Sequence, residues 1–262
     1  MIDNKKKQVF EILLMPIECT RYSKEKVEKV EIERKENIIE STQTYYPCKK
    51  CDITLDEDMS DFAIGFYEII YNKILNGNSI INKDNDSLCD SRYAGDTMNS
   101  FETIANRFPE AGKSKKNRTP QSSWPNILKE YKRQYHCLAN FWLIPSEIGR
   151  TIDKMNELCK GSYTYGIKDY MDRFLKKLLE KENKIKDYFS VDSFIDFANI
   201  HFLNGSYTYA DSKIYNFSDD NMNGEYVIER IIDRMRLRAT LIANSEYSGE
   251  LWEYFNGWDL IK

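Results

Sequence analysis

Apolar residues recur every three or four positions over most of this chain, which is the spacing of an amphipathic α-helix. On this pattern we predict helices over six segments: 60–76, 96–108, 123–142, 167–187, 191–202 and 225–244. Asn76-Gly77 is a helix stop signal, and Pro109 and Pro145 should end the second and third helices. The aromatic tail LWEYFNGW should then pack on the helical body.

The N-terminal part of the chain is less regular and carries most of the β signal. KQVFEILLMPIE is interpreted as a strand, and Val27, Val30 and Ile32 alternate with charged residues in VEKVEIERKE. A second strand or extended segment is expected between residues 207 and 215, where tyrosine and isoleucine favour sheet. The predicted fold class is mainly α with a minor β component (α+β). A short strand-rich region, 1–58, would pack on a mainly helical domain, 59–262, in one folding unit.

The composition indicates a folded protein that works in water. With 262 residues, 41% of them hydrophobic and 13% aromatic, the chain can bury a sizeable core. Its formal net charge of -4 gives no overall attraction to nucleic acid or to anionic lipid. The longest apolar runs, such as FEILLMPI, are too short to cross a membrane. Six irregularly spaced cysteines and the lack of a signal-peptide pattern favour reduced thiols and a cytoplasmic location.

The segment from Ser91 to Pro145 holds the strongest candidate site, because small polar groups and a histidine lie among aromatic residues there. If the helices predicted over 96–108 and 123–142 pack with their polar residues facing each other, Asp96 would orient His136 as a general acid or base. The imidazole of His136 and the side-chain amide of Asn140, four residues later, would share one helix face. The predicted ligand-binding residues are Arg92, Thr97, Asn99, Ser100 and Asn140.

A purely structural interpretation of the same residues stays open. Asp96 is an ordinary helix-capping residue, and Asn99 and Ser100 can satisfy local backbone groups. His136 can equally be a half-buried histidine whose ring nitrogens are satisfied within the fold. The sequence favours this structural interpretation over a catalytic or ligand-binding one.

Cys48 and Cys51 form a CxxC pair, a spacing at which two thiolates can bind one zinc ion. A structural zinc site needs two further ligands, and the sequence holds no second pair. Cys89, Cys137 or one of the two histidines would have to complete the site through the fold. We therefore expect ordinary thiols and no cofactor, with a zinc-stabilised module or a redox-active cysteine pair as alternatives.

The longest predicted helix carries a cationic stripe. Arg230, Arg234 and Arg238 recur there at every fourth residue. Such a stripe could bind the phosphate groups of a nucleic acid or an acidic protein partner. Glu229 and Asp233 alternate with the arginines, however, and this alternation favours a solvated, self-paired face.

Three blocks of the chain resemble a family of bacterial proteins of unknown function. The blocks follow the patterns DTxNSF, YHxxxNFxxxP and DYxDxFL, and they occur here at residues 96–101, 135–145 and 169–175. Leu138-Ala139 replaces the Ile-Gly that the family carries before Asn140. The resemblance implies one folding unit beyond residue 60 and assigns no activity.

The motifs of common enzymes are missing: there is no glycine-rich phosphate loop, HExxH or GxSxG. We therefore expect a binding or regulatory protein that acts on a protein or nucleic-acid partner, with no membrane involved, in the setting of phage–bacterium conflict. The alternative is an enzyme, a hydrolase or nuclease that uses the His/Asp/Asn site. The NFxLxP stretch distantly resembles the GNLTLL segment of some HNH-type nucleases, although their upstream histidine motif has no counterpart here.

Overall fold

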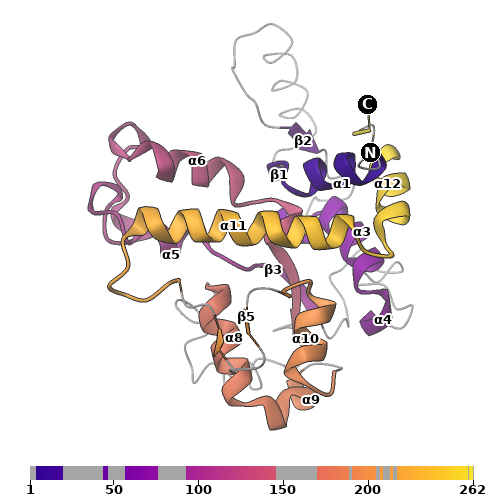
Figure 1. Ribbon diagram of the computed structural model, residues 1–262. Coiled ribbons are helices and arrows are strands. Elements are labelled where there is room, and N and C mark those ends of the chain that lie inside the picture. Colours follow the sequence, from indigo (N-terminus) through magenta and orange to yellow (C-terminus); the bar gives the residue numbers. More distant parts are fainter. Residues whose placement is uncertain are drawn as a thin grey trace, which may run out of the picture.

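In the computed structural model of the protein, the described residues are 4–19, 44–46, 57–75, 93–145, 170–188, 191–204, 207–208, 213–214, 217–258 and 260–261. These residues form a mainly helical molecule with three small two-stranded sheets. The predicted fold class, mainly α with a minor β component, is confirmed. Figure 1 shows one long helix, α11, which crosses the molecule.

The helices of the described residues are α1 (Asn4–Leu13), α3 (Asp61–Ile70), α4 (Asn72–Leu75), α5 (Phe101–Ala105), α6 (Asn126–Gln134), α8 (Met171–Glu180), α9 (Ile185–Tyr188), α10 (Phe194–Ile200), α11 (Gly224–Ala243) and α12 (Ser248–Asn256). The strands are β1 (Ile17–Cys19), β2 (Thr44–Tyr46), β3 (Tyr93–Thr97), β4 (Phe141–Pro145), β5 (Tyr207–Thr208) and β6 (Lys213–Ile214). Two short 3-10 helices matter below: η1 (Glu57–Met59) and η5 (Leu138–Asn140).

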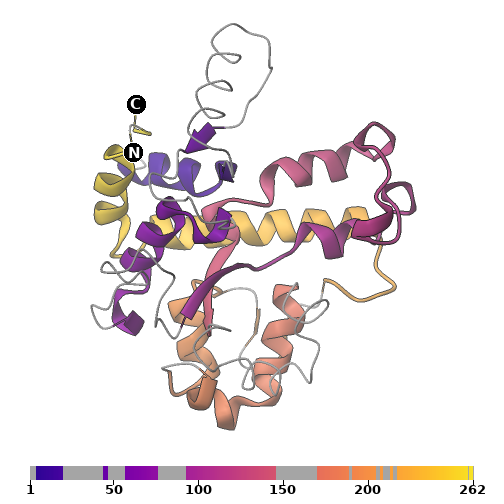
Figure 2. The same ribbon diagram turned by 180° about the vertical axis from the view of Figure 1, so that it is seen from behind.

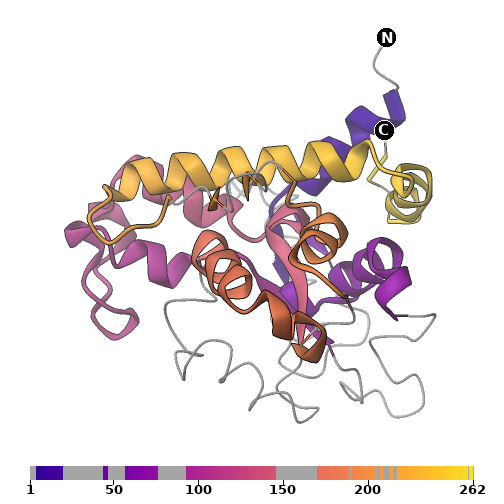
Figure 3. The ribbon, with the colours of Figure 1, turned by 60° about the horizontal axis from the view of Figure 1, so that its bottom comes forward.

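Helix α11 is the central element of the core. Asn223 caps its N-terminus by accepting a hydrogen bond of 2.8 Å from the backbone N–H of Glu225. Its buried hydrophobic residues recur at helical spacing: Val227, Ile228, Ile231, Met235, Ala239, Ile242 and Ala243. This face packs against α1, α5, α6 and η5. Figure 3 shows α11 lying along one side of the remaining elements.

Strands β3 and β4 form an antiparallel ribbon that runs through the core. Its register pairs Tyr93 with Pro145 at one end and Thr97 with Phe141 at the other. Trp142 of β4 packs edge-on against the ring of Phe174 of α8, with the ring centroids 4.9 Å apart. In Figure 2 the ribbon descends from the level of α11 toward α10. The ribbon therefore links the long helix to the group formed by α8 and α10.

The structure corrects the strand predicted for KQVFEILLMPIE. Residues 4–13 form helix α1, which buries Val9, Ile12 and Leu13 against α11 and α12. Tertiary packing of this helical face outweighs the β propensity of the segment. The N-terminal region does carry strands, because β1 and β2 pair in parallel with Ile17 opposite Thr44. The predicted alternation at residues 27–32 lies outside the described residues.

Two further helix predictions are wrong in part. The helix expected over 96–108 is reduced to α5, and Asp96 and Thr97 belong to β3 instead. The helix expected over 123–142 ends with α6 at Gln134, and β4 follows. Four consecutive residues of β4, from Phe141 to Ile144, are buried. A strand buried on both faces accommodates such a run, whereas an amphipathic helix would expose part of it.

The remaining helix predictions agree with the structure. The segments 60–76, 167–187, 191–202 and 225–244 contain α3 with α4, α8 with α9, α10 and α11. The predicted extended segment near residue 210 contains the β5–β6 hairpin, in which Tyr207 pairs with Ile214. The aromatic tail packs on the body as expected, since Phe62 stacks on Tyr254 at 5.8 Å and meets Trp258 edge-on at 5.3 Å. Within the described ranges, none of the helices is both long and apolar enough to cross a membrane.

Candidate functional site

The two polar segments that were predicted to build a site do meet, but as strands and turns rather than helices. Asp96 is the ladder partner of Trp142, and Thr97 that of Phe141. Just beyond this end of the ribbon, the side-chain amide of Asn99 donates a hydrogen bond of 3.1 Å to Oδ1 of Asn140. The structure therefore brings these two predicted residues together.

Asn99 and Asn140 are buried, and their hydrogen bonds stay within the chain. Nδ2 of Asn140 donates to the backbone oxygens of Tyr135 at 2.7 Å and of Asn99 at 3.2 Å. Oδ1 of Asn99 accepts from the backbone N–H of Met171 at 3.3 Å, and the Tyr131 hydroxyl donates to the Asn99 carbonyl at 2.9 Å. Buried amides with this many partners act as structural ties. The pair connects the ribbon to α6 and α8, which favours the structural interpretation of both residues.

The carboxylate next to His136 belongs to Glu57, which corrects the assignment of that role to Asp96. Nδ1 of His136 lies 3.2 Å from Oε2 of Glu57, and each side chain is 21% exposed. The Asp96 carboxylate instead accepts a hydrogen bond of 2.8 Å from the backbone N–H of Thr97. The Thr97 hydroxyl donates in turn to Asp58 at 3.3 Å. Asp96 and Thr97 are thus part of the contacts between β3 and η1.

The anion site expected at a helix start around residues 96–100 does not form there. Ser100 is the N-cap of α5, but its side chain makes no capping hydrogen bond. Helix α5 has five residues, too few for a strong helix dipole. Arg92, the remaining predicted ligand-binding residue, lies outside the described residues.

The predicted zinc ligands Cys48 and Cys51 also lie outside the described residues. Cys137 is a free and buried thiol, and burial raises its pKa to about 12. A thiol with so high a pKa is a poor nucleophile and a poor metal ligand. Among the residues that the structure describes, no three ligating side chains gather where they could hold a metal ion.

Arg238 is buried, which corrects the expectation that it belongs to a solvent-facing stripe on α11. Its side chain makes five hydrogen bonds. Nε donates to the carbonyl of His201 at 2.8 Å, and one terminal nitrogen donates to Tyr71 Oη at 3.1 Å. The other terminal nitrogen donates to the carbonyls of Leu138, Ala139 and Phe141 at 2.7–3.1 Å. These contacts make Arg238 a structural tie between α11 and three other segments.

The other two arginines of the predicted stripe are half-buried. Arg230 forms an ion pair of 3.1 Å with Asp233 and lies 5.4 Å from the centre of the Tyr226 ring. Arg234 lies one turn further along the helix. The self-paired interpretation fits Arg230, and the structure offers no continuous cationic face that includes Arg238.

Tyr71, His201 and Arg238 form a buried polar cluster. The Tyr71 hydroxyl lies 2.8 Å from Nδ1 of His201. Burial, and then the charge of Arg238, lower the pKa of His201 well below its ordinary value of 6.5. Burial likewise raises the pKa of Tyr71 above 10.0. The cluster therefore contains a neutral imidazole, a neutral phenol and one positive charge.

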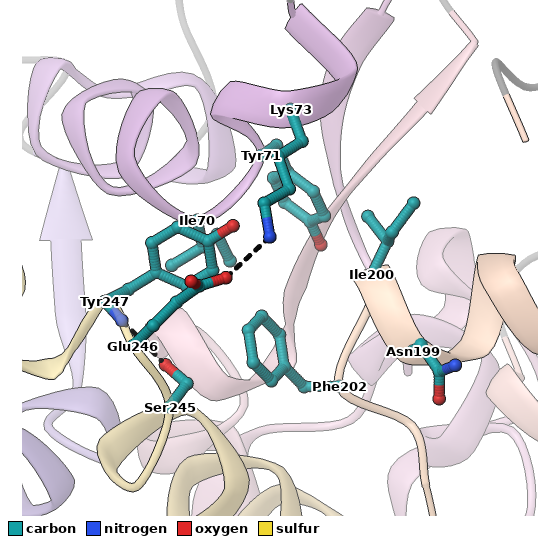
Figure 4. A pocket seen from close by; sticks show the side chains of 9 residues that line it. All are labelled: Ile70, Tyr71, Lys73, Asn199, Ile200, Phe202, Ser245, Glu246 and Tyr247. Carbon is teal, nitrogen blue, oxygen red and sulfur yellow. Dashed lines mark hydrogen bonds and ion pairs between the residues drawn. The ribbon is translucent and has the colours of Figure 1, made fainter.

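Tyr71 also lines a recess of about 300 Å³, which is the candidate site that the structure supports. The recess is lined by Ile70, Tyr71, Lys73, Asn199, Ile200, Phe202, Ser245, Glu246 and Tyr247 (Figure 4). Three segments contribute these residues: the end of α3 with α4, the end of α10, and the link between α11 and α12. Most of the lining is apolar or aromatic, with a few polar groups at its edge, as in many small-molecule sites.

Phe202 stands near the middle of this lining in Figure 4. It has a φ of 56°, in the left-handed region, and it directly follows the C-cap of α10. The backbone N–H of Leu203 donates to the carbonyl of Ala198 at 2.8 Å. The backbone N–H of Phe202 donates to the carbonyl of Asn199 at 3.1 Å. This is a helix-ending motif in which glycine is the usual residue at the left-handed position. The aromatic ring is therefore held in the recess at a cost to the backbone.

Lys73 and Glu246 form an ion pair at the edge of the recess. Nζ lies 2.6 Å from Oε1, and the two side chains are 68% and 65% exposed. The hydrogen bond between them raises the pKa of Lys73 and lowers that of Glu246. The ammonium also lies 5.9 Å from the centre of the Tyr247 ring. The recess thus has an apolar wall with one cation and one carboxylate at its rim.

Comparison of the chain with protein families, with curated proteins and with solved structures found no match. The resemblance to a bacterial family through the DTxNSF, YHxxxNFxxxP and DYxDxFL blocks therefore stays a prediction.

The residues of the recess were missed by the sequence analysis for a physical reason. Lys73 and Glu246 are ordinary surface charges in the sequence, and nothing local shows that they meet. The one available signal was at Phe202, because the predicted helix 191–202 ends without the glycine that commonly follows a helix.

Proposed function

We propose that the protein is a binding protein whose recess holds a small, largely apolar ligand. The observation that carries this proposal is the left-handed conformation of Phe202, whose ring lines the recess. A non-glycine residue in this conformation costs about 1–2 kcal/mol. Backbone strain of this kind concentrates at functional sites, where the surrounding structure maintains it.

The size and composition of the recess support the same proposal. Its volume of about 300 Å³ lies at the lower end of the range typical of small-molecule sites, about 300–1,000 Å³. Ile200, Phe202 and Tyr247 offer apolar contact area, and the buried side chain of Ile70 lies behind them. Asn199 supplies an amide group that can orient a ligand, whereas the Ser245 hydroxyl already donates to the carbonyl of Ile242 at 2.7 Å and accepts from the N–H of Tyr247 at 3.2 Å. A regulatory role through a protein or nucleic-acid partner in phage–bacterium conflict stays a prediction.

Isoleucine methyl groups provide a direct test of ligand binding. Protein with labelled isoleucine methyls would be titrated with 8-anilinonaphthalene-1-sulfonate and followed by NMR. We expect saturable shifts for Ile70 and Ile200, which line the recess, and none for Ile127 of α6. Saturable shifts that leave both Ile70 and Ile200 unmoved, or no shifts at all, would contradict the proposal.

A variant at Phe202 sharpens this test. Phe202→Gly removes the ring without straining the backbone, so the fold should persist while the affinity for the probe falls. Tyr226→Ala removes an exposed ring near the start of α11 and is the matched control. Equal affinities of the two variants would count against the recess as the binding site.

An enzymatic function is the second candidate, and the Glu57–His136 pair is the observation that favours it. The 3.2 Å contact places a carboxylate beside an imidazole that is partly exposed to solvent. This geometry suits a general base in a hydrolase or nuclease. Loss of an observed hydrolytic activity in His136→Gln, with the unfolding midpoint unchanged, would support this candidate over the binding protein.

A further inference from the structure

We infer that the ligand of the recess is a small amphipathic monoanion. Its anionic group would bind Lys73 in place of the Glu246 carboxylate, and its apolar body would lie against Phe202. This inference rests on the proposed function and names the ligand class of the same site. Three features of the structure carry it: an exchangeable carboxylate, a buried positive charge and an apolar wall.

The Glu246 carboxylate marks a position where an anion fits. It lies on Lys73 at 2.6 Å, and both residues line the recess (Figure 4). Ion pairs between side chains that are so exposed contribute little to stability, because solvent screens them and the side chains lose freedom. A carboxylate from a ligand can therefore replace that of Glu246 at little cost. The lysine then forms an equivalent bond next to the apolar wall.

Arg238 supplies a positive charge behind the wall of the recess. All five of its hydrogen bonds go to uncharged acceptors, which are four backbone carbonyls and the Tyr71 hydroxyl. The guanidinium stays charged in proteins. A buried charge whose hydrogen-bond partners are neutral creates a positive potential in its surroundings, because the interior screens it weakly. Tyr71 lies between this charge and the recess, so Arg238 favours an anion over a cation on the Tyr71 side of the recess.

The apolar wall selects an amphipathic ligand over a bare ion. Ile200 and the rings of Phe202 and Tyr247 offer no charge to a ligand, whereas burial of a hydrocarbon chain against them is favourable. A strongly hydrated ion such as phosphate would lose water without gaining partners deeper in the recess. One ammonium at the rim and a volume of about 300 Å³ limit the ligand to a single charge and a short body.

Three probes of equal chain length test the inference: octanoate, octan-1-ol and octylammonium. Their affinities would be measured by calorimetry at pH 7 and low ionic strength, with the methyl shifts of Ile70 and Ile200 as the site readout. We expect octanoate to bind about three- to fivefold more tightly than octan-1-ol, because its carboxylate exchanges the exposed Lys73–Glu246 pair for a similar bond beside the apolar wall. Octylammonium should bind most weakly of the three.

Two variants separate the roles of the rim residues. Lys73→Gln should remove the preference for octanoate over octan-1-ol. Glu246→Gln should raise the affinity for octanoate several-fold and leave that for octan-1-ol unchanged, because the competing carboxylate is gone. The exposed pair Lys7 and Glu11 of α1 gives charge-matched controls, Lys7→Gln and Glu11→Gln, which should change neither affinity.

Each result bears on the inference in a defined way. Equal affinities for the three probes, with Ile70 and Ile200 still shifted, would overturn the anionic ligand and leave the proposed binding function in place. Tightest binding of octylammonium, or no gain of octanoate affinity in Glu246→Gln, would also overturn it. No binding of any probe would overturn the proposed function together with this inference.

Discussion

The Arg238 guanidinium donates a hydrogen bond of 3.1 Å to the Tyr71 hydroxyl, so α11 holds one wall of the recess from inside the core. The same side chain donates to the carbonyl of His201, one residue before Phe202. Two of the three segments that form the recess are thus tied to α11 by one residue. The shape of the recess depends on this buried charge as well as on the residues at its surface.

We expect Arg238→Met to destabilise the protein by about 3–5 kcal/mol, because the change leaves several buried carbonyls without a donor. Denaturant unfolding would measure the change in the free energy of unfolding. The neighbouring residue Arg236 is exposed on the same helix, and Arg236→Met should change stability by less than about 0.5 kcal/mol. Similar losses in the two variants would show that the buried hydrogen bonds of Arg238 matter little.

The protein should lose stability in mild acid because His201 is buried in its neutral form. Its pKa is held below 6.5 in the folded state by burial and by Arg238, whereas in the unfolded chain it returns to about 6.5. Below pH 6.5 the unfolded state therefore binds a proton that the folded state does not. The stability contributed by the neutral imidazole is present above pH 6.5 and is lost as the pH falls.

The slope of this loss is at most about 1.4 kcal/mol per pH unit for one proton. Unfolding free energies measured between pH 6.5 and 5 would show it in the wild-type protein. His201→Gln keeps a polar side chain beside Tyr71 and cannot titrate, so its slope in this window should be smaller by that amount. Equal slopes in the wild-type protein and in His201→Gln would show that His201 does not cause the loss of stability in mild acid.

The long helices could be predicted from sequence because their signal is local. In α11 the cap at Asn223 and the apolar spacing from Val227 onward are contained in the helix itself. Helix α8 likewise shows its buried face through Met171, Phe174 and Leu178. Such elements bury one face whatever they pack against, so the pattern alone identifies them.

The ribbon and the buried arginine could not be predicted because distant segments decide them. Leu138 and Trp142 keep helical spacing, but Leu138 lies in η5 and pairing with β3 makes the residues from Phe141 onward a strand. Arg238 repeats with Arg230 and Arg234 like a surface stripe, yet its acceptors lie near residues 138–141, far away in the sequence. Local periodicity shows which residues share a face and does not show what covers that face.

Asn140 offers a test of the structural interpretation of the predicted polar site. Asn140→Ala removes the side-chain partner of Asn99 and takes one donor from the buried carbonyl of Asn99 and one from the part-buried carbonyl of Tyr135. We therefore expect a loss of about 2–3 kcal/mol in stability. Asn126→Ala, at an exposed position of α6, should cost less than about 0.5 kcal/mol. A stable Asn140→Ala protein would return this residue to the candidates for ligand binding.

Phe202 should show a reversed preference between alanine and glycine. Both substitutions remove the ring, which meets Tyr247 edge-on at 6.2 Å, but only alanine keeps the strain of a φ of 56°. We therefore expect Phe202→Gly to be more stable than Phe202→Ala by about 1 kcal/mol. At Phe10, within helix α1, we expect the alanine variant to be more stable than the glycine variant by about 1 kcal/mol, because glycine weakens a helix interior.

Denaturant unfolding of these four variants would measure both differences under the same conditions. Binding of octanoate to the two Phe202 variants then separates the ring from the backbone. Both should bind more weakly than the wild-type protein, because each lacks the ring that lines the recess, whatever its stability. If Phe202→Gly kept the wild-type affinity, the strained backbone would have no connection with ligand binding, and the ligand would have to bind outside the recess.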